Sequence, residues 1–395
     1  MRYLLLIFTL CFTLNADVLD FYKNALETLK YNKTYLLYEH ANELQQSGVQ
    51  YSKYANFALD ADYSNTKAVT LATPFNTTNV AFTDTMDLFG KQTYKINELK
   101  LGLDAKKETL KIKKEQLFIS LVNMISIYLQ TTQKLQLHQD FLNEQDKIYN
   151  KLQLLKKSGT VSDFELLRFK NTFIQLKITM ENEKSHIAKM AEQLHSYAPK
   201  LDIPNIKEAN FLYTKDKFLS NNPQKNLNEI DAKQLMAQAK TTSNKYLPDV
   251  IAGASYQKIT DPTSYGNNYS FNVGIHIPLN SDYYKQAEAL RVNALSIRTK
   301  NIEYIVQRKN EYIQRFQDYQ NAKTQLKILN ENLADYNKSE KTITIAFLKQ
   351  FVNFNTYLQV LTQVLNIKEQ IIQMKYQKIS QALIVNSISS GVIYE

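Results

Sequence analysis

The sequence predicts a membrane protein of mixed α and β class, built from two copies of one large unit. Matching segments begin at Tyr54 and Tyr246, 192 residues apart, and the elements that follow them keep nearly the same offset. Four segments of about ten residues alternate between apolar and polar side chains, a length that crosses a bilayer only as a tilted β-strand. Residues 75–198 and 279–395 contain no proline, so very long helices can run unbroken there.

The N-terminus predicts a cleavable signal peptide over residues 1–16. Arg2 precedes an apolar run from Leu4 to Phe12, and Leu14-Asn15-Ala16 offers a cleavage site. The alternative is an uncleaved amphipathic N-terminus. Cys11 is the only cysteine and has no lipobox before it, so the exported chain is expected to carry no thiol and not to be lipidated.

The first repeat is expected over residues 17–197. It opens with a helix at 18–50, where apolar residues recur at three- and four-residue spacing. The period then switches to two, which predicts a β-hairpin at 54–90 with a polar loop at 64–78. A long helix at 91–156 would span roughly 100 Å. A tip loop at 157–162 and an antiparallel helix at 163–197 complete the repeat.

A linker at 198–228 contains three of the seven prolines and separates the repeats. The second repeat, 229–395, begins with a helix to about Lys245 and a β-hairpin at 246–281. A long helix at 283–347, a tip loop at 348–353 and a helix at 354–386 follow. Along the first long helix the apolar positions narrow to a seven-residue seam, which is typical of coiled coils.

Charge and motifs exclude several classes of function. The formal net charge is +10, but the lysines alternate with acidic residues along helices, which favours solvated helix faces over a nucleic-acid-binding patch. No cofactor, catalytic or metal-binding motif is found. The histidines show no metal-ligand spacing and are expected to be solvated or packed; they are His40, His138, His186, His195 and His276.

The strand count requires several chains. Two strand pairs cannot close a barrel, and open sheet edges are not tolerated in lipid because their N–H and C=O groups find no water there. Several copies must therefore pool their strands, and the same symmetry places the long helices in a ring around one axis. The expected result is a β-barrel continuous with a hollow helical cylinder.

Over residues 17–390 the chain resembles the TolC-like outer-membrane efflux proteins. The segments that carry the resemblance are Tyr246-Leu-Pro-Asp-Val250, Ile275-His-Ile-Pro-Leu279, Lys157-Ser-Gly-Thr-Val-Ser-Asp-Phe-Glu-Leu-Leu167 and Asn222-Pro223. The resemblance implies a homotrimer with a twelve-stranded barrel, four strands per protomer, in outer-membrane lipid, and a periplasmic helical barrel below it. It also implies partners, a periplasmic adaptor and an inner-membrane transporter, and passive export of drugs, metals or polypeptides.

The resemblance further implies that the helix tips narrow the entrance, often with acidic residues of the second repeat. Those positions fall on Gln359 and Thr362 here, a departure from the pattern. In the first repeat, Asp163 and Glu165 would make a cation-attracting ring around a threefold axis, or they serve as first-turn residues that complement the helix dipole. The expected entrance residues are Gly159, Ser162, Asp163, Glu165, Asn355, Thr356, Gln359 and Thr362. The expected adaptor-docking residues are Leu155, Lys156, Leu348 and Lys349.

Two other functions compete with the channel. A periplasmic coiled-coil adaptor or scaffold would use the helical hairpins as a spacer. It would not need lipid-facing alternation in two duplicated hairpins. An exported enzyme with coiled-coil arms would need a catalytic constellation, and the sequence shows none.

Overall fold

The computed structural model describes residues 16–54, 56–66, 75–87, 89–206, 208–260, 265–280 and 282–395. Residues 1–15 of the expected signal peptide, with Cys11, lie outside the described residues, as do 67–74 and 261–264 of the expected hairpin loops. The chain forms two compact units. Unit 1 holds the residues up to Tyr31, Lys111–Asn222 and Val306–Glu395, and unit 2 holds Asn32–Leu110 and Pro223–Ile305. Each unit draws on both halves of the sequence, so the units do not coincide with the two expected repeats.

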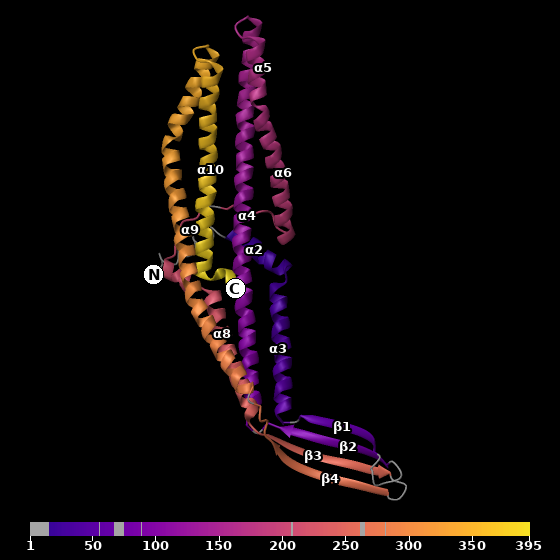
Figure 1. The fold of residues 1–395 in the computed structure, drawn as a ribbon. Helices are drawn as coiled ribbons and strands as arrows, with labels where there is room; N and C mark the ends of the chain where they lie inside the picture. Colours follow the sequence, from indigo (N-terminus) through magenta and orange to yellow (C-terminus); the bar gives the residue numbers. More distant parts are fainter. Residues whose placement is uncertain are drawn as a thin grey trace. The chain divides into compact units, whose positions relative to one another are not determined.

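Unit 2 contains a four-stranded antiparallel sheet with the order β1-β2-β3-β4 (Figure 1). The strands are β1 (Phe57–Thr66), β2 (Phe75–Met86), β3 (Asp249–Thr260) and β4 (Tyr265–His276). Both predicted hairpins are confirmed, and β2 pairs with β3 to join the two halves of the sequence. Among the described strands, β1 pairs with β2 alone and β4 with β3 alone, so the sheet has two open edges.

The strand register separates apolar from polar side chains. One row across the sheet joins Leu59, Phe82, Ala254 and Phe271 on one face. The neighbouring row joins Asp60, Ala81, Ser255 and Ser270 on the other face. The apolar face is open: Leu59 is 70% exposed and Phe271 87%. Contiguous apolar surface of this kind marks a site of contact with lipid or protein.

The helices of unit 2 are joined to the strands one by one. Helix α3 (Tyr31–Tyr54) leads into β1, and α4 (Lys91–Lys157) follows β2. Helix α8 (Pro223–Ser243) and the short 3-10 helix η1 (Asn244–Tyr246) lead into β3, and α9 (Asp282–Leu348) follows β4.

Polar contacts within unit 2 show that the helices lie in the same order as the strands. Each neighbouring pair is joined by a side-chain amide that donates a hydrogen bond. These bonds are Asn42 Nδ2 to the Leu99 carbonyl at 2.8 Å (α3 to α4), Asn226 Nδ2 to Glu108 Oε2 at 3.4 Å (α8 to α4) and Asn228 Nδ2 to Asn301 Oδ1 at 3.2 Å (α8 to α9). Helices α3 and α9 are therefore the outer helices of this layer.

Unit 1 is helical. Its elements are α2 (Ala16–Thr28), α5 (Asp163–Thr172), α6 (Ile174–Tyr197), α7 (Lys215–Ser220), α10 (Phe354–Ser390), the short 3-10 helix η2 (Val392–Tyr394) and the remaining parts of α4 and α9.

Several predicted boundaries differ, three of them as follows. The helix expected at 18–50 is broken after Thr28, where Lys30 takes a left-handed conformation with φ of 56°. The helix expected at 163–197 is interrupted at Phe173, whose side chain is buried. The expected linker contains α7, and α8 begins inside it at Pro223, because proline suits the first position of a helix.

The core of unit 1 packs α2 against α4 and the C-terminal part of α10. Tyr22 is 2% exposed, and its ring meets that of Phe118 edge to face at 5.2 Å. Its hydroxyl donates to the carbonyls of Ile393 at 2.8 Å and of Lys114 at 3.2 Å. A buried phenol needs such partners, so these bonds fix α2 in one position.

Two asparagines hold the segment that follows α6 in place. Asn386 of α10 donates to the carbonyl of Asn210 at 2.7 Å and accepts the Leu212 N–H at 2.9 Å. Asn221 donates to the carbonyls of Ile388 and Ser389, which lie near the end of α10. The expected linker is therefore a packed part of unit 1.

His138 joins three helices of unit 1. This α4 residue is 2% exposed, with Nδ1 3.0 Å from Glu183 of α6 and Nε2 3.0 Å from Glu369 of α10. Lys134 Nζ also lies 3.5 Å from Glu369. The hydrogen bond to Glu369 raises the pKa of His138, burial opposes this rise, and Glu183 adds to it. The same bond lowers the pKa of Glu369.

The His138 contacts predict a pH-dependent stability. A raised folded-state pKa gives a stabilisation that is fully present below the unfolded value, about pH 6.5, and is lost as pH rises through the folded value. We expect His138→Gln to lower stability by about 1–3 kcal/mol at pH 6 and by less at pH 9. Thermal unfolding of the purified protein across this range measures the difference. The exposed His186→Gln is the matched control, and equal losses at both pH values would contradict the prediction.

Candidate functional site at the helix tips

The two helical hairpins of unit 1 end in turns of the same construction. Gly159 (φ 77°) follows α4, and Gln350 (φ 64°) follows α9. In each turn the next N–H reaches back to a carbonyl five residues earlier: Thr160 to Leu155 at 3.0 Å, and Phe351 to Ala346 at 2.8 Å. The predicted left-handed cap at Gly159 is confirmed. Gln350 holds the equivalent position without glycine's freedom, a strain of about 1 kcal/mol.

Both returning helices carry side-chain N-caps. Ser162 Oγ accepts the Glu165 N–H at 3.2 Å, and the Glu165 carboxylate accepts the Ser162 N–H at 3.1 Å. This reciprocal pair is a capping box. Asn353 caps α10 by accepting the Thr356 N–H at 2.9 Å. The predicted N-cap at Ser162 is confirmed, and Glu165 is part of it.

Asp163 is differently placed. Its side chain is 82% exposed, and its carboxylate forms an ion pair with Lys156 across the first tip turn. A surface pair of this kind contributes little to stability. The Asp163 carboxylate is therefore exposed at the tip, whereas Glu165 has a structural role in the cap.

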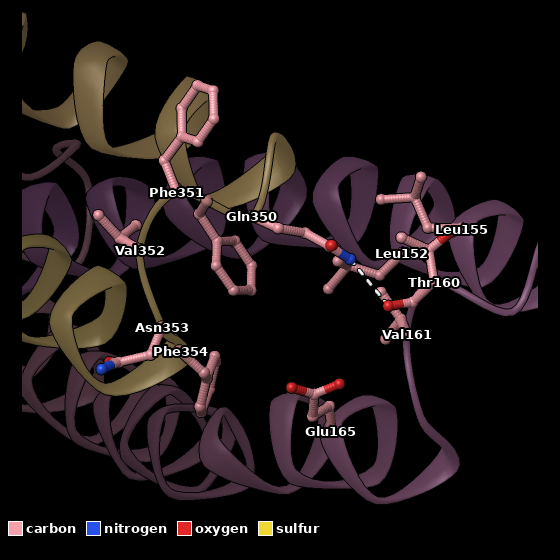
Figure 2. A pocket seen from close by; sticks show the side chains of 11 residues that line it. Leu152, Leu155, Thr160, Val161, Glu165, Gln350, Phe351, Val352, Asn353 and Phe354 are labelled. Carbon is pink, nitrogen blue, oxygen red and sulfur yellow. Dashed lines mark hydrogen bonds between the residues drawn. The ribbon is translucent and has the colours of Figure 1, made fainter.

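Two side chains that were not among the predicted site residues, Gln350 and Arg168, join the two tips. Gln350 Nε2 donates to the Thr160 carbonyl at 2.8 Å (Figure 2). Arg168 donates to Asn355 Oδ1, and its guanidinium lies 5.4 Å from the ring centre of Phe354. Arg168 is the single arginine between Arg2 and Arg291, which is the one sequence signal that could have singled it out.

A cavity of about 340 Å³ lies between the tips. Its apolar wall includes Leu152, Val161 and Phe354, and the Glu165 carboxylate points toward it (Figure 2). Phe351 at its margin is 78% exposed. The cavity is open to contact by another molecule at an apolar rim.

Aromatic side chains fix the hairpins just behind the tips. Phe169 is 2% exposed, and its ring centre lies 5.6 Å from that of Phe354 and 6.4 Å from that of Phe347. Tyr357 stacks on Phe347 at 4.3 Å and donates its hydroxyl to Gln145 Oε1 at 2.8 Å. Burial raises the pKa of Tyr357 to about 12. This cluster gives the exposed tip residues a rigid base.

The predicted entrance residues of α10 are all exposed. They are Asn355, Thr356, Gln359 and Thr362. Asn355 and Thr356 take part in the tip bonds described above, and the Thr362 hydroxyl donates to the Leu358 carbonyl at 2.9 Å.

The predicted docking residues divide into two kinds. Lys156 and Lys349 are exposed, whereas Leu155 and Leu348 pack partly against the aromatic cluster. The two leucines therefore offer less surface to a partner than the sequence suggested.

No group of three or more His, Cys, Asp or Glu side chains in the described part of the chain is arranged to hold a metal ion. The two carboxylates at His138 lie on opposite sides of its ring and cannot converge on one ion.

The sequence matches no family model and no curated protein. Solved structures, in contrast, match almost the whole chain. The outer-membrane channel OprN superposes with a TM-score of 0.78 at 12% identity, over 95% of this chain and 90% of that one. The outer membrane protein VceC from Vibrio cholerae gives 0.76 at 12% identity, over 95% and 96%. The Campylobacter jejuni CmeC outer membrane channel gives 0.71 at 13% identity, over 95% and 85%.

These similarities show that the chain has the fold of outer-membrane channels. The resemblance to TolC-like proteins is thereby confirmed for the fold of the single chain. Among the described helices, none combines the length and the apolar character that a membrane span requires.

The left-handed turn at Gln350 generates a prediction. Gln350→Ala removes the bond to Thr160 and keeps the strain, whereas Gln350→Gly removes both. We expect hydrogen-exchange protection across residues 346–362 to fall more in the alanine variant, by about 1 kcal/mol of local opening free energy. Gly159→Ala, the matched change in the other tip, should lower the free energy of local opening there by a similar amount. Equal protection in the two Gln350 variants would show that the turn stores no strain.

Proposed function

We propose that the chain is one protomer of an outer-membrane exit channel of a tripartite efflux or type I secretion system. In this proposal three copies pool their strands into one twelve-stranded barrel, and their helices form a periplasmic tunnel. Substrates pass through it without chemical change. One observation carries the proposal: a sheet with an exposed apolar face and two open edges.

The environment of the sheet supports a lipid location. Residues such as Phe271 and Val273 are 87% and 80% exposed, so the described part of the chain does not cover this face. Lipid would cover this face, while the opposite face, with Ser255 and Ser270, would line a watery lumen. The open edges of β1 and β4 cannot remain unpaired in hydrocarbon.

The strand number supports three copies. Two copies would supply eight strands, and the interior of an eight-stranded barrel is largely filled by side chains. Three copies would supply twelve and leave room for a lumen. The similar structures are described as outer-membrane channels, which agrees with this assembly. Export by the expected signal peptide, and partnership with an adaptor and an inner-membrane transporter, belong to the same proposal.

The alternative of a periplasmic adaptor or scaffold explains the hairpins but not the sheet. A protein confined to water would leave the row of Leu59, Phe82 and Phe271 exposed to solvent. The channel gives this row a partner in lipid.

A fractionation experiment tests the channel. We expect the processed chain in the outer membrane, and we expect the detergent-extracted protein to have the mass of a trimer. The trimer should insert into planar bilayers and conduct ions, whereas a heat-dissociated sample should not. A folded, processed chain recovered only as a soluble monomer would exclude the proposal.

Asp163 and Glu165 give a prediction about ion preference. Three copies of Asp163 near one axis would attract cations, because a constriction focuses the field of clustered charge. We expect Asp163→Asn to lower the cation-to-anion permeability ratio severalfold in bilayers. Glu165→Gln, which can retain the capping bonds, should have a smaller effect.

Reversal potentials in a salt gradient measure this ratio. Glu181→Gln, an exposed change on α6, is the control. An unchanged permeability ratio in the Asp163→Asn, Glu165→Gln double variant would show that both carboxylates only stabilise the helix N-terminus and do not affect passing ions.

A further inference from the structure

His138 connects the two helical hairpins of unit 1 through its buried imidazole ring. The residue belongs to α4 of the first hairpin and is 2% exposed. Its Nδ1 lies 3.0 Å from Glu183 Oε2 on α6, which belongs to the same hairpin. Its Nε2 lies 3.0 Å from Glu369 Oε1 on α10, which belongs to the second hairpin. One ring therefore holds a helix of each hairpin against α4.

The two contacts require both ring nitrogens of His138 to donate. An ionised carboxylate only accepts hydrogen bonds, and a neutral imidazole has one N–H and one lone pair, whereas the imidazolium has two N–H groups. The contact with His138 lowers the pKa of Glu369, so this carboxyl group is ionised at neutral pH. The observed arrangement therefore belongs to the protonated ring. A neutral ring would turn a lone pair toward one of the two carboxylates.

The charges around the imidazole are not arranged equally on its two sides. Glu369 has a second cation beside it, because Lys134 Nζ of α4 lies 3.5 Å from its Oε2. Glu183 pairs with no other cation in the part of the chain that the structure describes. Lys368, the residue before Glu369 on α10, pairs instead with Glu340 of α9 at 2.8 Å.

Loss of the proton should therefore weaken one contact more than the other. The tautomer with the proton on Nδ1 leaves both carboxylates with a donor, since the ring still donates to Glu183 and Lys134 stays beside Glu369. The Nε2 lone pair then faces Glu369 Oε1, and two acceptors at hydrogen-bond distance repel each other. The contact that weakens is the one to α10, between the hairpins. The contact to α6, within the first hairpin, remains.

We propose that His138 is a proton-operated link between the two hairpins: the imidazolium holds α10 against α4, and the neutral imidazole keeps α6 but releases α10. The link acts within one chain and goes beyond the proposed channel function. The hydrogen bond to Glu369 raises the pKa of His138 above its ordinary value of 6.5, so release takes place on the alkaline side of that value. The linked fraction should fall about tenfold for each pH unit above the folded-state pKa.

Distances between spin labels on the full processed chain test the link. Cys11 lies in the expected signal peptide, so introduced thiols would be the only ones present. Gln139→Cys with Gln370→Cys reports the distance from α4 to α10, and Gln139→Cys with Asn182→Cys reports that from α4 to α6; all three positions are exposed. Between about pH 5.5 and about pH 9, the first distance should shift to longer values while the second stays constant.

Glu183→Gln is the deciding variant. An amide accepts from the imidazolium and donates to Nδ1 of the neutral ring, so the Nε2–H can stay with Glu369 at every pH. The distance from α4 to α10 should then remain short over the whole range. His138→Gln should give the long distance at every pH. His186→Gln changes an exposed histidine of α6 and is the matched control, which should keep the response of the unmodified chain.

The outcomes separate the link from a merely structural histidine. A distance from α4 to α10 that does not change with pH overturns the proposal, as does a response that persists in Glu183→Gln or disappears in His186→Gln. If His138→Gln does not fold, Glu183→Gln still decides. The measurement needs neither a membrane nor ion flow, so its failure leaves the proposed channel standing, and a channel that does not conduct leaves the link standing.

Discussion

The two unpaired edges of the four-stranded sheet are the constraint on which the rest of the structure depends. Each edge presents backbone N–H and C=O groups that must find partners wherever water is excluded. In the proposed channel the apolar row through Leu59 and Phe271 lies in lipid, where water is scarce. A single chain cannot satisfy both conditions there. The proposal of further copies therefore rests on hydrogen bonding and burial, independently of the similar structures.

Because the helices of unit 2 are connected directly to the strands, the constraint on the strands also applies to the helices. Each helix is joined to one strand, so the order of the sheet sets the order of the helical layer. An open sheet thus produces an open layer, with α3 and α9 at its sides. Both outer helices have exposed apolar positions, such as Leu44 and Ile302. In the proposed ring of copies each of these helices would have a neighbour on both sides.

Periodicity in the sequence predicts the parts of the fold that depend on local pattern. The long helices, both hairpins and the cap at Ser162 follow from spacing and residue type. The break at Lys30 escaped prediction because the apolar spacing continues across it without proline or glycine. The bond from Gln350 to Thr160 escaped it because 190 residues separate the partners, and no local pattern encodes such a pair. The left-handed backbone conformation of Gln350 likewise cannot be predicted from the composition of the sequence.

The helix tips are joined by weak, exposed hydrogen bonds, whereas the aromatic cluster behind them is buried and stable. Tyr357 and Phe169 are almost fully buried, and removing such a ring from a core costs about 3–5 kcal/mol. The bonds from Gln350 to Thr160 and from Arg168 to Asn355 are exposed, and bonds of this kind contribute only about 1 kcal/mol each. The backbone strain at Gln350 offsets part of the free energy that its bond to Thr160 contributes. The free energy that these exposed bonds contribute is thus small beside that of the aromatic cluster, in which Phe169 of the first hairpin packs against Phe347 and Phe354 of the second. The aromatic cluster and His138, which contact residues of both hairpins, therefore hold the helices together behind the tips, whereas the exposed tip bonds contribute little.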